Sequence, residues 1–167
     1  MAVRVLVVDD SAFYRRRVIE ALSAQGDIVV AGEAGDGLEA VEKARALRPD
    51  LITMDVTMPR LSGVEAVKRI IAERRVPIIM FSSLTTEGAK ATLEALEAGA
   101  ADFVPKHPGR GGEDPRAAMA QLCTSIRLLV ARAARGAREA PAVAAHAIPA
   151  APQSVLVPAV DIELIVI

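Results

Sequence analysis

Five short apolar runs, each separated from the next by a segment of helical periodicity, constrain the fold of this chain more than any other feature. The runs are rich in Val and Ile and occupy residues 3–8, 28–31, 51–54, 78–81 and 101–104. Short continuous apolar runs are typical of strands that are buried on both faces, and their alternation with helices is the pattern of repeated βα units. The sequence therefore predicts a doubly wound α/β fold with an open parallel sheet.

The segments between these runs carry apolar side chains at intervals of three and four residues, which predicts amphipathic helices. The last and longest stripe is formed by Met119, Leu122, Ile126, Leu129, Val130 and Ala133. Ser11 is placed to cap the first helix, whose apolar face includes Tyr14. Pro49 and Pro77 limit the second and third helices, and Gly99 is placed to end the fourth. These signals predict a helix after every strand.

The C-terminal part of the chain differs in composition from the rest. Helical periodicity fails beyond residue 135, so we expect one domain over residues 1–135 and an extended Ala/Pro-rich linker over residues 136–160. The chain ends on residues 161–167, which have the composition of a buried strand. An unpaired apolar strand favours association, so we expect this run to be the first strand of a second domain. A tail strand that docks on this domain or on a partner is the alternative.

Composition and charge exclude several classes of function. The net charge of −1, the dispersed basic residues and the absence of Trp argue against binding to nucleic acid. The single cysteine, Cys123, excludes an internal disulfide and a zinc site, which fits a reducing cytoplasm. No uninterrupted apolar stretch approaches the roughly 20 residues that span a bilayer. We therefore expect a cytoplasmic protein with no membrane insertion and no nucleic-acid partner.

Polar side chains follow the ends of four predicted strands. Asp9 and Asp10 follow the first strand, Asp55 the third, Ser82 the fourth and Lys106 the fifth. Ligands of open parallel sheets bind beyond the carboxyl ends of the strands, where these residues converge. Three carboxylates repel one another unless a cation joins them, and their oxygens suit Mg²⁺. The pattern predicts a pocket that binds a metal and charges an aspartate with phosphate. Lys106 is expected to pair with Asp55 before the reaction and with a phosphoryl oxygen after it, while the Ser82 hydroxyl donates to another phosphoryl oxygen.

Each of these residues, taken alone, also has a purely structural interpretation. A lone aspartate after a strand is usually a turn or cap residue, and so is a lone Ser82. Lys106 alone is solvated surface, and Phe103, inside the fifth predicted strand, is core packing by default. His107 and His146 have no partner at ligand spacing and are interpreted as surface residues. The joint placement of the polar residues at successive strand ends favours the site.

Separate sequence motifs carry a family resemblance. Residues 55–63 read D-V-T-M-P-R-L-S-G and follow the third predicted strand. The other motifs are V-D-D-S at the end of the first strand, S-S after the fourth and V-P-K at the end of the fifth. With these motifs, residues 1 to about 130 closely resemble the receiver domain of two-component response regulators. The segments M-D-V-T-M-P, P-I-I-M-F-S-S-L-T-T-E-G-A and L-E-A-G-A-A-D-F-V-P-K are similar to chemotaxis protein-glutamate methylesterase, whose receiver precedes a catalytic domain. The resemblance implies a flavodoxin-like (βα)5 sheet with strand order 2-1-3-4-5.

The resemblance also implies roles in phosphoryl transfer. Asp55 is the expected phosphoacceptor, charged by the sensor histidine kinase of the chemotaxis system or by a small phosphodonor. Lys106 is expected to contact the phosphoryl group. Ser82 is the expected switching hydroxyl and Phe103 its aromatic rotamer partner. The output face would then include the fourth helix, the fifth strand and the fifth helix.

The metal site and one departure from the family pattern complete the expectations. The resemblance implies that Mg²⁺ is held by the side chains of Asp10 and Asp55 and the backbone carbonyl of Thr57, with Asp9 acting through water. The family usually follows its lysine with proline in a cis peptide, whereas here His107 stands between Lys106 and Pro108. A cis bond between the lysine and the histidine would cost roughly 3 kcal/mol, so we expect a changed local geometry and an altered phosphorylation rate.

Three functions compete for this chain. The first is the regulatory receiver of a methylesterase, in which residues 161–167 begin a truncated catalytic domain and chemoreceptors are reached through that domain. The second is a stand-alone receiver that acts as a phosphate relay or sink. The third is a hydrolase, which the sequence disfavours because it contains no G-x-S-x-G and neither histidine has a triad setting. We therefore expect no esterase chemistry in this polypeptide itself.

Overall fold

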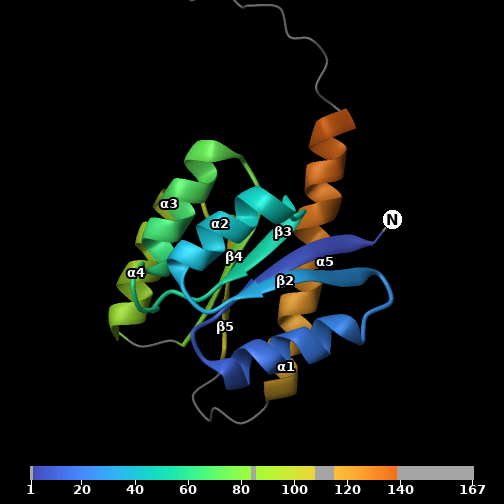
Figure 1. Ribbon diagram of the computed structural model, residues 1–167. Coiled ribbons are helices and arrows are strands. Elements are labelled where there is room, and N and C mark those ends of the chain that lie inside the picture. The colour runs from blue at the N-terminus through green and yellow to red at the C-terminus, as the bar shows by residue number, and fades with distance from the viewer. Residues whose placement is uncertain (1, 84–85, 108–114, 139–167) are drawn as a thin grey trace, which may run out of the picture.

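The computed structural model describes residues 2–83, 86–107 and 115–138, and within them strands and helices alternate along the chain. The order is β1 (Val3–Val8), α1 (Ala12–Ser23), β2 (Ile28–Ala34), α2 (Gly37–Leu47), β3 (Leu51–Met54), α3 (Gly63–Glu73), β4 (Ile78–Ser82), α4 (Thr86–Glu97), β5 (Asp102–Pro105) and α5 (Pro115–Arg138). The central sheet and the surrounding helices are seen in Figure 1. The predicted α/β class is confirmed.

All strand pairs are parallel, and the strand order is β2-β1-β3-β4-β5. The order implied by the family resemblance is therefore confirmed. The strand β1 pairs with both β2 and β3, with Val8 opposite Met54 at its end. Because every strand runs in the same direction, the loops that follow the strands gather at one edge of the sheet.

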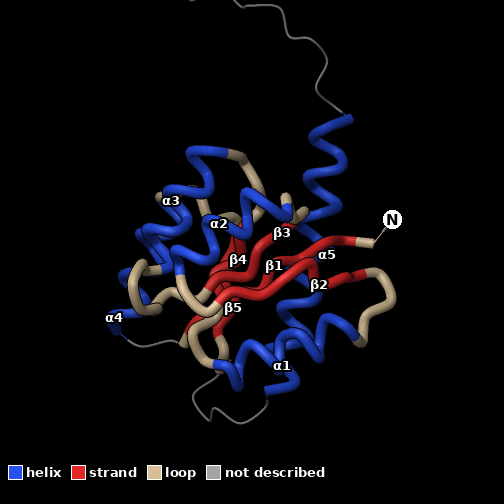
Figure 2. Tube along the Cα trace, in the orientation of Figure 1, coloured by secondary structure: helices blue, strands red, loops and turns tan. Residues whose placement is uncertain are grey.

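The helices cover both faces of the sheet, with α1 and α5 on one face and α2, α3 and α4 on the other (Figures 1 and 2). Side chains alternate across the strands, so each face has its own core. The core under α1 and α5 includes Val5, Val7, Leu51, Ile79, Phe81, Leu122 and Ile126. The core under the other three helices includes Leu6, Val8, Ile52, Met54, Val67, Ile70, Ile78 and Met80. Burial on both faces explains the continuous apolar runs in the sequence.

Several helix ends follow the signals in the sequence. The side chain of Ser11 caps α1 as predicted, and Asp36 and Ser62 cap α2 and α3 by accepting hydrogen bonds from first-turn N–H groups. The second helix ends before Pro49. Gly99, which follows α4, has a φ of 110°, a left-handed conformation that glycine adopts without a Cβ penalty. These ends place the N-termini of α1 and α3 next to the carboxyl edge of the sheet.

The structure also moves some predicted boundaries. The strand β2 continues to Ala34, because an edge strand pairs on one side only and tolerates polar residues such as Glu33. The helix α5 continues to Arg138, since alanine and arginine are strong helix formers, so residues 136–138 are helical rather than linker. The remainder of the predicted linker and strand, residues 139–167, lies outside the described residues, as does His146. Among the described residues, none of the helices combines the length and the apolar composition that a membrane span requires.

Candidate functional site

Three carboxylates meet at the carboxyl edge of the sheet. Asp9 and Asp10 follow β1, Asp55 follows β3, and each offers an oxygen that lies within 4.8 Å of the others. Asp9 and Asp55 are buried, whereas Asp10 is exposed. The backbone N–H of Asp55 donates to the carbonyl of Val8 at 3.0 Å, which joins the ends of the two strands. The structure thus brings together the acids that the sequence analysis singled out.

Lys106, which follows β5, enters this acidic cluster. Its Nζ lies 2.7 Å from Oδ2 of Asp9 and 2.8 Å from Oδ2 of Asp55, and only 5% of its side chain is exposed. The ion pair with Asp55 matches the sequence prediction, whereas the pair with Asp9 was not predicted. The backbone N–H of Lys106 also donates to the carbonyl of Ser82 at 2.9 Å. One ammonium group is therefore shared between two buried carboxylates.

The shared ammonium changes the titration of the buried groups. Burial raises the pKa of Asp9, and the nearby charge of Asp55 raises it further, which together outweigh the lowering by Lys106. Burial alone would lower the pKa of Lys106, but Asp55 and Asp9 outweigh it and raise that pKa. The lysine therefore stays protonated at neutral pH. The site therefore holds a fixed positive charge next to Asp9, whose ionised form is disfavoured by burial.

The donor set of the site fits a hard divalent cation. With all acids ionised, three carboxylates and one ammonium leave two uncompensated negative charges (−3 + 1 = −2). Carboxylate oxygens are preferred ligands of Mg²⁺, which retains several waters, and the exposed carboxylate of Asp10 gives the cluster access to solvent. Thr57, the fourth predicted ligand, lies exposed in the loop after β3. Its carbonyl is two residues from Asp55 along the chain.

The two predicted switch residues lie on neighbouring strands. Ser82 is the last residue of β4 and is buried, and it pairs with Pro105 in the register of the sheet. Phe103 lies on β5 opposite Met80 and is half-buried against the core under α2, α3 and α4. Core packing of Phe103 was the default interpretation of this residue, and the structure agrees with it. Ser82 thus lies beside Lys106, and Phe103 lies on β5, the edge strand that Lys106 follows.

Gly63 is a site residue that the sequence analysis missed. It opens α3, and its N–H donates to the carbonyl of Val56 at 2.9 Å, so the helix starts against the end of β3. A Cβ at this position would overlap the carbonyl oxygen of Asp55 and lie 2.9 Å from its carbonyl carbon. The available signal was the glycine that ends the D-V-T-M-P-R-L-S-G segment.

A second group that the sequence analysis missed is the pair of Tyr14 and His107. The ring of Tyr14 lies over Lys106, with Nζ 4.6 Å from the ring centroid. The hydroxyl of Tyr14 is hydrogen-bonded to Nε2 of His107 at 2.8 Å. His107 is exposed, as predicted, but it is not without a partner. The peptide bonds of the described residues, including Lys106–His107, are trans, so the cis geometry of the family is absent here.

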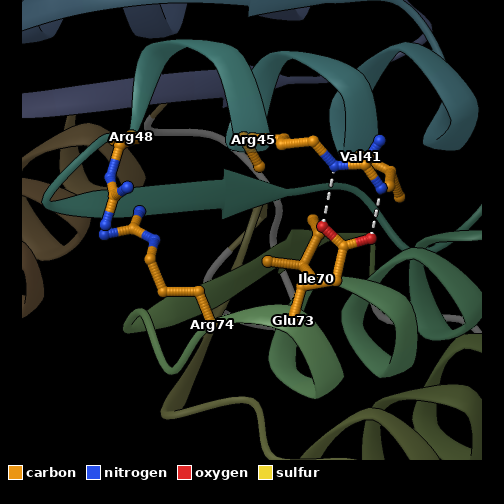
Figure 3. A pocket seen from close by; sticks show the side chains of 7 residues that line it. Val41, Arg45, Arg48, Ile70, Glu73 and Arg74 are labelled. Atoms are coloured by element: carbon orange, nitrogen blue, oxygen red, sulfur yellow. Dashed lines mark hydrogen bonds and ion pairs between the residues drawn. The ribbon is translucent and has the colours of Figure 1, made fainter.

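A separate cavity of about 190 Å³ lies between α2 and α3 (Figure 3). It is lined by Val41, Ala44, Arg45, Arg48, Ile70, Glu73 and Arg74. An ion pair between Arg45 and Glu73, with N–O distances of 2.9 and 2.5 Å, crosses its rim. These residues lie toward the C-terminal ends of their helices, which in βα units are at the edge of the sheet opposite the carboxylates. The cavity therefore takes no part in the acidic site.

Comparison with known proteins assigns the chain and its fold to a family. The sequence pattern of the response regulator receiver domain matches residues 5–111. The chain belongs to the response regulator receiver domain family. This receiver domain is 48% identical to the crystal structure of the response regulator domain of Thermotoga maritima CheB, with a TM-score of 0.71. That match covers 78% of this chain and 97% of the other.

Two further relatives extend the comparison. This receiver domain is 49% identical over 134 residues to a protein-glutamate methylesterase/protein-glutamine glutaminase of Lawsonia intracellularis, covering 79% of this chain and 38% of that protein. It is 29% identical to a chain of the CheX-CheY-BeF3-Mg+2 complex from Borrelia burgdorferi, covering 65% of this chain and 81% of the other, with a TM-score of 0.58. The chain spans about a third of the length of the curated relatives it matches. The resemblance to the receiver of a chemotaxis methylesterase is confirmed.

Proposed function

We propose that this receiver domain accepts a phosphoryl group on Asp55 and so acts as the regulatory switch of a chemotaxis methylesterase. The observation that carries the proposal is the buried ion pair between Lys106 and Asp55 inside a cluster of three acids. An ammonium next to the acceptor carboxylate neutralises charge that develops on the transferred phosphoryl oxygens. A purely structural aspartate at a strand end has no need of this arrangement.

The acceptor carboxylate is held by one contact on each oxygen. Oδ1 of Asp55 accepts a hydrogen bond from the N–H of Val56 at 2.7 Å, and Oδ2 accepts one from Lys106 at 2.8 Å. In the proposed step, a carboxylate oxygen of Asp55 attacks phosphorus in line with the leaving group. The bond from phosphorus to the donor breaks, and the donor, a phosphohistidine or a small phosphodonor, keeps the electron pair. Fixing the nucleophile in this way removes part of the entropic cost of the transfer.

Mg²⁺ is the proposed cofactor of this step. The residues that would hold it are Asp10, Asp55 and the carbonyl of Thr57, with Asp9 acting through water. When bound, the metal would supply positive charge to the phosphoryl oxygens. The proposal is supported by the fit of the three carboxylates to a hard cation and by the similar Borrelia burgdorferi protein, whose crystal structure is named as a complex with BeF3 and Mg+2.

The signal would pass from the acyl phosphate to the α4, β5 and α5 face. Phosphorylation adds charge and acceptor oxygens beside Ser82, which favours a conformation in which its hydroxyl bonds the phosphoryl group. Phe103, on the adjacent strand, would change its rotamer as space opens beside the serine. Such a switch shifts an equilibrium between two conformations that both exist before the reaction.

The proposed partners follow from the methylesterase relatives. We propose that a chemotaxis sensor histidine kinase donates the phosphoryl group. We also propose that residues 139–160, which follow the end of α5, link this domain to a methylesterase domain that begins at residues 161–167. Chemoreceptors would be reached through that domain, and the pathway would operate in the cytoplasm. The similarity over the receiver portion of the Lawsonia intracellularis methylesterase supports this context.

Labelling with a small phosphodonor tests the proposed function. Incubation with acetyl phosphate and Mg²⁺ is expected to add one labile phosphate per chain, detected by intact mass, and chelation of Mg²⁺ should prevent it. Asp55→Asn should abolish the labelling. Asp50→Asn is the matched control, because Asp50 is an exposed aspartate that contacts the backbone of Arg4 at the opposite edge of the sheet. Unchanged labelling of Asp55→Asn would show that the acceptor has been assigned wrongly.

A further inference from the structure

The ammonium of Lys106 has aromatic as well as carboxylate neighbours. Its Nζ lies 4.6 Å from the ring centroid of Tyr14 and 5.9 Å from that of Phe81. The face of an aromatic ring attracts a cation, and the attraction is larger where water is excluded. Lys106 is buried, and its ammonium contacts Asp9 and Asp55 as well as the ring of Tyr14. The tyrosine thus belongs to the surroundings of the lysine that contacts the acceptor.

His107 holds that tyrosine in place. Its Nε2 is 2.8 Å from the hydroxyl of Tyr14, and the two rings meet edge to face with centroids 6.0 Å apart. Tyr14 lies on α1 and His107 directly follows Lys106, so the hydrogen bond joins two segments that are 93 residues apart in sequence. The backbone of Lys106 is therefore tied to α1 through its neighbour, while its ammonium contacts the ring of the same tyrosine.

We propose that Tyr14 and His107 form a clamp that positions the Lys106 ammonium over the Asp55 carboxylate. The inference rests on the proposed phosphoacceptor function and names two positioning residues for it. A lysine side chain has four rotatable bonds, and its carboxylate partners change during the reaction, because Asp55 becomes an acyl phosphate. The contact with the tyrosine ring does not depend on the state of Asp55. The clamp therefore keeps the ammonium in the site when its ion pair with Asp55 is lost.

A double-mutant cycle on the labelling rate tests the clamp. Tyr14→Phe keeps the ring and removes the hydroxyl, and His107→Leu removes the hydrogen-bonding nitrogen. Each variant is expected to be phosphorylated by acetyl phosphate about two- to tenfold more slowly than wild type, which is the effect expected from the loss of one hydrogen bond. The double variant should be no slower than the slower single variant. His107→Gln, whose amide reaches the same hydroxyl, should return the rate to within about twofold of wild type.

Fluorescence provides a second readout that does not depend on phosphorylation. Tyr14 is the only tyrosine and the chain has no tryptophan, so tyrosine emission reports on this one side chain. A hydrogen bond between the phenol of a tyrosine and an imidazole quenches tyrosine emission. His107→Leu should therefore emit more strongly than wild type, whereas Arg127→Gln, which loses an exposed ion pair with Asp27, should match wild type in emission and labelling rate. Far-ultraviolet circular dichroism verifies that each variant is folded.

The outcomes separate the clamp from the function on which it rests. If wild type takes up no phosphate, the proposed function fails and the clamp fails with it. If wild type is labelled on Asp55 but Tyr14→Phe and His107→Leu match it in rate, the clamp alone is overturned. Equal emission from wild type and His107→Leu also overturns the clamp, because the hydrogen bond is then absent. Additive rate losses in the double variant have the same consequence, since independent effects need no link between the two residues.

Discussion

Replacing Gly63 by alanine is expected to displace the acceptor aspartate and thereby impair both folding stability and phosphorylation. The added Cβ would overlap the carbonyl oxygen of Asp55 and lie 2.9 Å from its carbonyl carbon and 3.1 Å from the Cα of Val56. All of these atoms belong to the backbone at the end of β3, which cannot move aside by a rotamer change. The helix α3 and the strand must separate instead.

The size of the effect follows from the required separation. Carbon atoms in contact are ordinarily about 3.5–4.0 Å apart, so the two backbones must part by about 1 Å. Overpacking of this kind typically costs about 1–3 kcal/mol of unfolding free energy. A misplacement of about 1 Å in a reacting group can lower its rate roughly 100-fold. We therefore expect Gly63→Ala to lower the free energy of unfolding by about 2 kcal/mol and to be phosphorylated about 10- to 100-fold more slowly.

Urea denaturation and the rate of labelling by acetyl phosphate measure the two effects. Gly26→Ala is the matched control, because a Cβ at Gly26 would meet nothing within 4 Å. It should be labelled at the wild-type rate and unfold within about 1 kcal/mol of wild type, with any gain arising from a less flexible unfolded chain. If Gly63→Ala has the same denaturation midpoint and labelling rate as Gly26→Ala, the close approach of Gly63 to Asp55 does not constrain the site.

Two further predictions concern charged groups. Lys106→Met leaves the buried carboxylates of Asp9 and Asp55 without their counter-ion. The free energy of unfolding measured in urea at pH 7 without Mg²⁺ should therefore fall by about 3 kcal/mol. Added Mg²⁺ should restore part of this loss, and no restoration would contradict a metal site at these acids. The pair of Asp27 and Arg127 is exposed, and the hydrogen bond from Arg127 lowers the pKa of Asp27 below its ordinary 3.8. The contribution of this ion pair to the free energy of unfolding is fully present above the ordinary pKa of Asp27 and is lost as the pH falls through the lowered pKa. Arg127→Gln should therefore be less stable than wild type at pH 7 and equal to it at the acid end of the titration, and a constant difference across pH would exclude the ion pair as the cause.

The sheet and the acidic residues were accessible from the sequence because both depend on local patterns. Burial on both faces requires continuous apolar runs, and these mark β1, β3 and β4 closely. Parallel strands all end at one edge, and the strand order that the family resemblance implies makes β1 and β3 neighbours, so the aspartates after these two strands were expected to lie near each other. The edge strand β2 was underestimated, because its exposed side allows polar residues that interrupt the apolar run. The end of α5 was underestimated for a different reason, since strong helix formers continue beyond the last apolar contact.

The contacts of Lys106 could not be predicted in the same way. The sequence suggested an ion pair with Asp55, but the second carboxylate, Asp9, becomes a partner only through the packing of β1 between β2 and β3. The hydrogen bond between Tyr14 and His107 joins two segments that no periodicity relates.

What the sequence determined by itself is therefore the set of strands, their common direction and the identity of the acids at their ends. Hydrophobic periodicity and chain connectivity are local properties, and they suffice for these features. Only the tertiary structure decided which groups share the Lys106 ammonium and how closely Gly63 approaches Asp55. Those features depend on how closely the strand ends and α3 approach one another, to within a few tenths of an ångström, and this is fixed only when both cores are packed.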